Sequence, residues 1–351
     1  MENRSGKFRM LATKLIAGIV AVLGSIPLLS STAFANPVPP PSDTSYYIYT
    51  STTVLDAYTW GCNQAQADAY TWGCNQAQAD ASTGHNSLVV FDDGAQTGDG
   101  AYTVQQGEPV TDSSYWLTVG WDEQLAEQFA LGYQNCGSHQ EYTDLAMGTN
   151  NSAGTTNSST GVAWGQTVQA AINNIVSANY VNATIYGAGD WESWGHFSDV
   201  SNWEGGYVSA TSANIVDFGS ADGCTASYNP ETTDQVCSYY PYPNNTVPDW
   251  TQNDYVLVSW GWTPALALPQ IYFNGSSGCP YPTYPIQDIQ WGMISLRGVN
   301  LNNGTGPIYF SGPLGTNGTC EPPNGAYIDL WNVINNTPST AMTPYYLGTM
   351  S

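Results

Sequence analysis

Hydrophobic and polar positions along the chain follow two alternating periods. Short runs of β-branched and aromatic residues predict strands, and stretches with apolar residues three or four apart predict helices. Predicted strands lie at 46–54, 87–92, 143–148, 183–186, 215–218, 270–273 and 307–310. Predicted helices lie at 121–133, 164–180, 200–210, 250–260, 287–296 and 327–334. Pro269 lacks a backbone donor, so we expect the sixth strand to pair only after it.

This order predicts the fold class. Seven or eight strand-then-helix units with almost no hairpin signals favour parallel strands joined by crossover helices. A single (β/α)8 domain similar to a TIM barrel is the simplest architecture of this length, and an open doubly wound sheet is the alternative. No glycine-rich phosphate loop follows the first strand, which weakens a nucleotide-binding interpretation, and no cofactor is predicted.

The first residues have the pattern of an export signal. A charged segment from Arg4 to Lys14 precedes an apolar stretch at 15–29, and Ala33-Phe34-Ala35 has the small-x-small form of a cleavage site. We therefore expect a signal peptide at 1–35, a proline-rich lead-in at 36–45 and one domain at 46–351. A retained anchor is the alternative, although the apolar stretch is short for a membrane span.

The net charge of the chain limits the classes of partner that it can bind and suggests the pH at which it works. After residue 35 the chain has no lysine and a single arginine, Arg297. This part of the chain also contains 27 of the 28 acidic residues, so its formal charge is −26. Nucleic acids and anionic membranes need clustered cations, so neither is an expected partner. Protonation of the carboxylates would remove most self-repulsion, which favours a protein adapted to acid. An acidic protein that works at neutral pH is the alternative.

A perfect duplication explains an odd number of cysteines. The sequence DAYTWGCNQAQA occupies 56–67 and again 68–79, and we interpret it as an insert that lengthens one helix or loop. Cys62 and Cys74 are copies of one position, so the seven cysteines reduce to six, enough for three disulfides. The predicted pairs are Cys62 or Cys74 with Cys136, Cys224 with Cys237, and Cys279 with Cys320. Metal binding is not expected, because no CxxC occurs and acid would protonate the ligands.

Polar and aromatic residues gather where the predicted strands end. In a parallel barrel these ends share one face, where functional residues lie. Carboxylates beside exposed aromatic rings are typical of a sugar site, since rings stack on sugar faces and acids bind hydroxyls or transfer protons. The predicted substrate-binding residues are Asp92, Asp93, Asn150, Asn151, Trp191, Trp194, Gln270 and Tyr272. Turn formation for the asparagines and core packing for the tryptophans are the competing interpretations.

The segment Gly187-Ala188-Gly189-Asp190-Trp191-Glu192 carries the sharpest resemblance. An Asp two residues before a Glu at the end of the fourth strand resembles the D-x-E element of chitinase-type and some lysozyme-type glycoside hydrolase barrels. With the segments GTNNS, DFGSADGC and LPQIYF, it makes the chain similar to uncharacterised exported bacterial barrel proteins that resemble glycoside hydrolases. The resemblance implies that Glu192 donates a proton and that Asp190 orients Glu192 or the sugar. The fuller chitinase pattern has further acids upstream, where this chain has Ile185 and Ala188.

Two functions therefore remain open. In the first, the chain hydrolyses a glycosidic bond of an extracellular carbohydrate polymer, with Glu192 as acid and Asp190 or Asp217 assisting. In the second, it binds glycans or serves at the cell surface without catalysis. Gln270 favours the second, because it lies where many glycosidases have a strand-end glutamate.

Overall fold

The computed structural model describes residues 43–49, 63–104, 111–151, 156–193, 195–226, 234–237, 250–261, 265–271, 287–301, 307–316, 323–336 and 346–350. They form an α/β domain around one ten-stranded sheet with the order β8-β7-β6-β5-β2-β1-β10-β9. The strands of this order are β1 (Asp43–Tyr49), β2 (Ser87–Thr97), β5 (Thr143–Asn150), β6 (Ala183–Asp190), β7 (Ile215–Asp217), β8 (Ala265–Ala267), β9 (Leu314–Thr316) and β10 (Tyr346–Met350), and each pairs in parallel with its neighbours.

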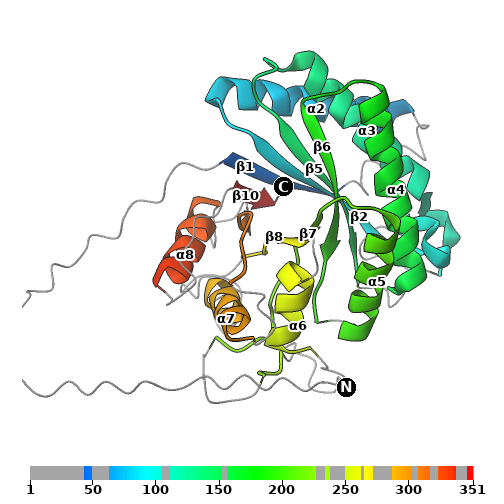
Figure 1. Cartoon of the computed structure of the whole chain (residues 1–351). Helices are drawn as coiled ribbons and strands as arrows, with labels where there is room; N and C mark the ends of the chain where they lie inside the picture. The colour runs from blue at the N-terminus through cyan, green and yellow to red at the C-terminus, as the bar shows by residue number, and fades with distance from the viewer. Residues whose placement is uncertain are drawn as a thin grey trace, which may run out of the picture. The chain divides into compact units, whose positions relative to one another are not determined.

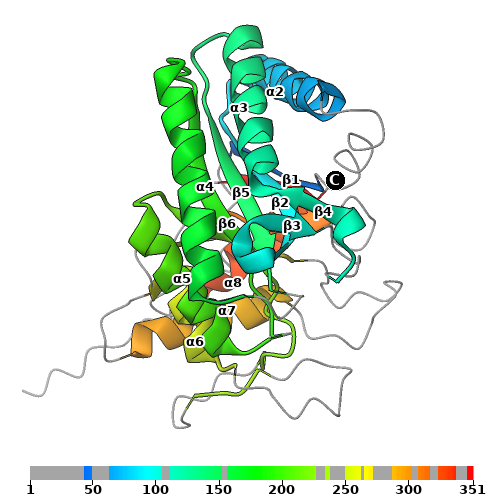
Figure 2. The same ribbon diagram turned by 90° about the vertical axis from the view of Figure 1, so that its right-hand side faces the viewer.

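Helices connect these strands in chain order. They are α2 (Asn63–Thr83), α3 (Val119–Cys136), α4 (Ser158–Ser177), α5 (Phe197–Ala210), α6 (Gln252–Val256), α7 (Gln287–Asn300) and α8 (Pro323–Asn336). Short 3-10 helices occur at Gly98–Gly100 and Ser113–Tyr115, and a π-helical turn at Leu257–Gly261 continues α6. Figures 1 and 2 show α3 and α4 side by side, and α6, α7 and α8 together in another part of the domain. α7 packs between α6 and α8, and α8 packs against β9 and β10. The strand-then-helix order and the parallel pairing confirm the predicted α/β class.

Several boundaries differ from the prediction. β8 is Ala265–Ala267 and lies before Pro269, so the expectation that pairing starts after this proline was wrong. Pro269 contributes its carbonyl, which accepts from the Leu314 amide at 2.8 Å, and a carbonyl is the one ladder group that proline keeps. The last strands are also displaced: a single bridge occurs at Phe310, and β9 starts at Leu314.

One hairpin was not foreseen. β3 (Tyr102–Val104) pairs antiparallel with the far end of β2 and with β4 (Trp116–Thr118). The turn between β2 and β3 does carry a hairpin signal, the Asp-Gly pair of Gly98-Asp99-Gly100, and all three residues have a positive φ. The sequence between β3 and β4 has no such two-residue signal, and both strands are too short for periodicity to reveal them.

The two faces of the strands belong to two apolar clusters. One cluster packs the helices against residues such as Val89, Leu145 and Ile185. The other, which we call the inner cluster, contains Leu88, Val90, Ala146, Ala188, Val216, Phe218, Leu268 and Leu314. Alternation of side chains along each strand produces this division, because neighbouring positions point to opposite faces. Isolated parallel bridges join Ala267 to Phe310 and Gln270 to Leu314, next to the two end strands of the order given above.

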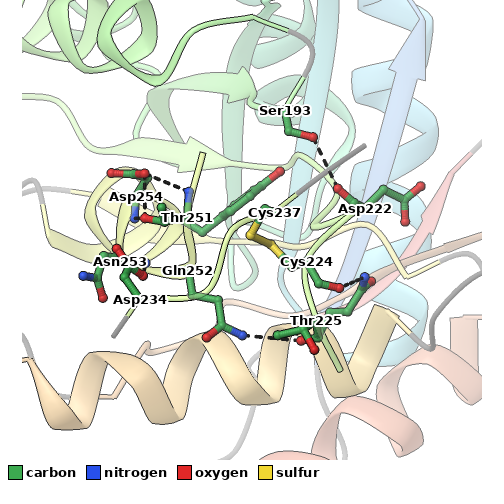
Figure 3. The surroundings of a disulfide bond; sticks show 12 residues. Ser193, Asp222, Cys224, Thr225, Asp234, Cys237, Thr251, Gln252, Asn253 and Asp254 are labelled. Carbon is green, nitrogen blue, oxygen red and sulfur yellow. Dashed lines mark hydrogen bonds between the residues drawn. A yellow bond between two sulfur atoms is a disulfide. The ribbon is translucent and has the colours of Figure 1, made fainter. Parts of the chain in front are cut away.

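Helix ends and disulfides agree with the local sequence. Thr251 caps α6 by accepting from the Asp254 amide, and the Asp254 carboxylate accepts from the Thr251 amide in return, the reciprocal pattern of a capping box. The disulfides Cys74–Cys136 and Cys224–Cys237 confirm two predicted pairs, with Cys74 as the copy that joins Cys136. Figure 3 shows the second disulfide beside Asp222. The expected Cys279–Cys320 pair and Cys62 lie outside the described residues. In the part of the chain that the structure describes, no helix is both long and apolar enough to cross a membrane.

Candidate functional site

A layer of polar side chains lies above the inner cluster, at the carboxyl ends of the strands. Asp92, Asn150, Asp190 and Gln270 each fall an even number of residues after an inner-cluster residue, so they point to the same face. All four are at most 6% exposed. Gln270 Nε2 donates to Asp190 Oδ1 at 3.3 Å, and Asn150 is the register partner of Asp190. We call these four residues the inner polar layer.

The loop after β6 is held by a buried tryptophan. Trp191 is fully buried and packs edge-on against Trp203, with 4.8 Å between ring centroids. A Cβ at Gly189 would overlap its indole, and one at Gly219 would overlap its backbone, so both glycines are needed for this close approach. The ring of Trp191 is thus covered by protein, and we assign no sugar to it.

Asn151 fixes the next residue of the loop. Its side-chain amide donates to the Glu192 carbonyl at 2.7 Å and accepts from the Glu192 amide at 3.4 Å. The Glu192 side chain is half-buried, and its Oε1 accepts a hydrogen bond from Ser220 Oγ. Glu192 is therefore more exposed to solvent than the buried carboxyls Asp92, Asp190 and Asp217. Asn151 holds its backbone in place through the two hydrogen bonds.

Asp217 faces away from the inner cluster. Its neighbours Val216 and Phe218 belong to that cluster, so Asp217 points towards the helices. It accepts from the Gly219 amide at 3.1 Å and from Ser259 Oγ in the π-helical turn. Burial raises the pKa of Asp217 to about 7, although hydrogen bonds from Ser259, Gly219 and the Trp191 backbone oppose the rise. Asp217 thus ties together the segments that carry Glu192 and Ser220.

The carboxyl groups act on one another electrostatically. Burial raises the pKa of Asp190 well above its usual range, and the charges of Glu192, Asp92 and Asp217 raise it further, while the Gln270 hydrogen bond lowers it. Each ionised neighbour makes the next ionisation harder, so Asp190 and Asp217 retain their protons at a pH where isolated carboxyls have lost theirs. We call Asp92, Asp190, Glu192 and Asp217 the carboxylate cluster.

Glu204 and Ser259 were missed by the sequence reasoning. Glu204 on α5 is 1% exposed, and burial raises its pKa well above the usual range, with the charge of Asp217 adding to the effect. The Trp191 side chain opposes this rise. A signal for Glu204 exists: Val200, Trp203, Glu204 and Tyr207 have the i, i+3, i+4, i+7 spacing of a buried helix face, which places an acid in an apolar stripe. Ser259 carries no comparable signal.

The remaining predicted residues have varied positions. Asp93 is buried at 3% exposure, directly after Asp92. Asp222, which lies in the loop after β7, accepts from Gln287 Nε2 at 2.9 Å. Its carbonyl accepts from Ser193 Oγ at 3.3 Å (Figure 3). Trp194 and Tyr272 lie outside the described residues.

The structure thus brings Asp92, Asp190, Glu192, Asp217 and Gln270 into one interacting group, with Asn150 and Asn151 adjoining it. Among the described residues, no group of three or more His, Cys, Asp or Glu side chains has an arrangement that could hold a metal ion. No protein-family model matches the sequence, and a comparison with curated proteins finds no significant similarity.

Proposed function

We propose that this chain is an exported glycoside hydrolase that acts on an extracellular carbohydrate polymer in acid, with Glu192 as the proton donor. The carboxylate cluster is the observation that carries the proposal. Asp190 and Asp217 are buried carboxyls with raised pKa values, and the charge of Glu192 contributes to both shifts. Such coupling supports a hydrolase site, because glycosidic cleavage needs a protonated acid beside an ionised partner. Glu192 is the half-buried member, so it is the one placed to reach a glycosidic oxygen.

The other residues have supporting roles in this proposal. Asp190 influences the charge of Glu192 from the inner polar layer, and Asp217 positions the loop from the opposite face of the sheet. Asn151 and Ser220 hold the Glu192 backbone and carboxylate, which restricts the side chain to one orientation. The resemblance of Asp190-Trp191-Glu192 to the D-x-E element of glycoside hydrolases agrees with these roles.

We propose further that the sheet is closed into a (β/α)8 barrel. The support is local pairing between the two end strands: Ser311 and Leu314 amides donate to the carbonyls of Ala267 and Pro269, and the Ile271 amide donates to the Leu314 carbonyl. The inner cluster also contains residues from both ends of the strand order, Leu268 and Leu314. In a barrel, the inner polar layer would form the floor of the site.

Export is supported by two kinds of observation. Disulfides form and persist in oxidising compartments, and the chain has at least two. The charged, apolar and small-x-small segments of residues 1–35 have the order of a cleavable signal.

The first experiment measures the release of reducing ends from chitin, peptidoglycan, α-glucans, β-glucans and xylan at acid and neutral pH. We expect release from one class, strongest in acid, and at least a hundredfold loss in Glu192→Gln, because a general acid contributes about 10²–10⁴-fold. Glu141→Gln is the matched control: Glu141 precedes β5, at the opposite end of that strand from Asn150.

A glycan-binding protein without catalysis is the second candidate. Gln270 favours it, because a neutral amide that donates to Asp190 occupies a strand-end position suited to a catalytic acid. Pull-down by one polymer without release of reducing ends from any would support this second function. Equal release by the wild-type protein and Glu192→Gln would reject Glu192 as the acid.

A further inference from the structure

The duplicated segment in α2 offers the most specific unassigned feature of the molecule. The identity is longer than the twelve-residue unit, since Asp80 and Ala81 continue it: 56–69 and 68–81 have the same fourteen letters, DAYTWGCNQAQADA. The second copy lies within α2, whereas the first copy extends from 56 into the start of that helix.

The second copy makes a set of specific contacts with α3 and β2. Cys74 is bonded to Cys136 on α3, and Trp72 packs edge-on against Phe91 with 6.1 Å between ring centroids. A Cβ at Gly73 would overlap the Phe129 carbonyl, so this position requires glycine.

Asp80 anchors the end of the same segment. It is 1% exposed and accepts from Ser87 Oγ at 2.8 Å, from Tyr133 Oη at 2.7 Å and from Gln76 Nε2 at 2.7 Å. Ala69 and Ala77 are also buried against the helical core. Each of these α2 residues has an identical residue twelve positions earlier: Ala57, Trp60, Gly61, Cys62, Gln64, Ala65 and Asp68.

From this identity we propose that α2 docks in two registers, and that the second register places Cys62 opposite Cys136 and Asp68 against Ser87 and Tyr133. The contacts that 68–80 make with α3 and β2 would be made by the identical residues 56–68 in the second register. Positions 81–83, which follow Asp80 in the helix, are exposed, so the residues after Asp68 would meet no packing restriction at these three positions. Gly84 has a φ of +70°, which Trp72 would not adopt, so the helix would have to end differently in the second register.

The two registers differ in where the twelve surplus residues lie. In the observed register they belong to the connection from β1 to the docked helix, and in the other they belong to the connection from the helix to β2. Loop closure depends only logarithmically on loop length, so transferring residues between these connections changes the free energy little. The first connection leaves β1 at Tyr49, the register partner of Asp92, so the exchange changes the length of chain at the end of the sheet that carries the carboxylate cluster.

Exchange between the registers requires no oxidant. The Cys62 thiolate attacks Cys136 Sγ, the Cys62–Cys136 bond forms, and Cys74 leaves as a thiolate that takes up the proton lost by Cys62. The reaction needs a thiolate, so it proceeds near neutral pH and is slow in acid, where the register formed during folding is retained.

Disulfide mapping of the full chain tests the proposal. The protein is refolded at pH 8 in a glutathione redox buffer, acidified, alkylated and cleaved with chymotrypsin. Cleavage after aromatic residues and leucine gives 61–70 for the first copy and 73–88 for the second, which differ in mass. We expect the wild-type protein to yield both peptides linked to the Cys136 peptide.

Three variants make the outcome decisive. Cys74→Ser is expected to leave Cys136 unalkylated and bonded to Cys62, with the same urea midpoint as Cys62→Ser. The double variant is expected to expose Cys136 to full alkylation and to have a lower midpoint. Free Cys136 in Cys74→Ser, or failure of that variant to fold while Cys62→Ser folds, would overturn the proposal. A disulfide-linked dimer through Cys62 would also overturn it, because the proposed bond lies within one chain.

Discussion

Asp217 shows how one residue links burial to pH. Its pKa rises from 3.8 to about 7, mainly through burial. The folded state therefore keeps the proton between pH 4 and 7, whereas the unfolded chain releases it. The stabilisation is complete below pH 4 and is lost as the pH rises to 7. A shift of about three pKa units corresponds to roughly 4 kcal/mol in the free energy of unfolding.

We expect Asp217→Asn to flatten this pH dependence. The amide oxygen can still accept from the Gly219 amide, and the new NH2 group can donate to Ser259 Oγ, which lies where it now donates to the second carboxylate oxygen. The side chain, however, no longer ionises. Urea unfolding at intervals from pH 3.5 to 7.5 measures the effect. Asp199→Asn, a partly exposed position on α5, controls for the loss of one acid. An unchanged slope in Asp217→Asn would contradict this account of Asp217.

Sequence reasoning found the members of the carboxylate cluster but not the direction of each side chain. Strand-end position identified Asp92, Asp190 and Asp217 from the chain alone. Whether Asp217 points inwards depends on the phase of β7 relative to Val216, and three residues are too few for periodicity to define that phase. The burial of Trp191 was equally inaccessible, because it depends on Gly219 in a separate loop.

Glycine contacts determine the spacing of helices α4 and α5. A Cβ at Gly206 would overlap the Ser158 carbonyl, and a Cβ at Gly161 would overlap the Trp203 carbonyl, so the two backbones touch at both points. α5 follows the loop that carries Glu192, and its Trp203 packs against Trp191, so this spacing also supports the site. Sequence alone cannot reveal such reciprocal contacts, because a glycine within a helix also has a low helix propensity and therefore indicates a less stable helix.

Substitutions at two adjacent glycines distinguish a glycine that is required for close helix packing from one that only lowers helix propensity. Gly206→Ala should destabilise the protein by about 1–3 kcal/mol, because the helices must move apart. Gly205→Ala is the matched control: nothing lies within 4 Å of a Cβ there, so the gain in helix propensity should stabilise by about 0.5–1 kcal/mol. Urea midpoints at pH 4 compare the variants. A similar effect of both substitutions would show that the backbone contact at Gly206 is not tight.

At the scale of the whole molecule, charge composition was the property most fully available from sequence. The chain has 28 acidic residues and five lysines and arginines together. After residue 14 the sequence contains no lysine and one arginine, Arg297. In the structure Arg297 Nε donates to Asn253 Oδ1 at 2.6 Å, between α7 and α6, so this cation supports helix packing. The excess of acids is therefore left to repel itself at neutral pH.

This repulsion predicts a dependence on salt that changes with pH. At pH 7 carboxylates at the protein surface are ionised. Sodium chloride screens their repulsion over about 10 Å at 0.1 M and about 3 Å at 1 M. We therefore expect the melting temperature to rise by several degrees between low salt and 0.5 M sodium chloride at pH 7. At pH 3 most carboxylates are protonated, so the same addition should have little effect. Scanning calorimetry at both pH values, with equimolar sucrose as a control for preferential exclusion, measures the difference. An equal response to salt at pH 3 and pH 7 would mean that the acidic composition serves solubility and does not limit the stability of the fold.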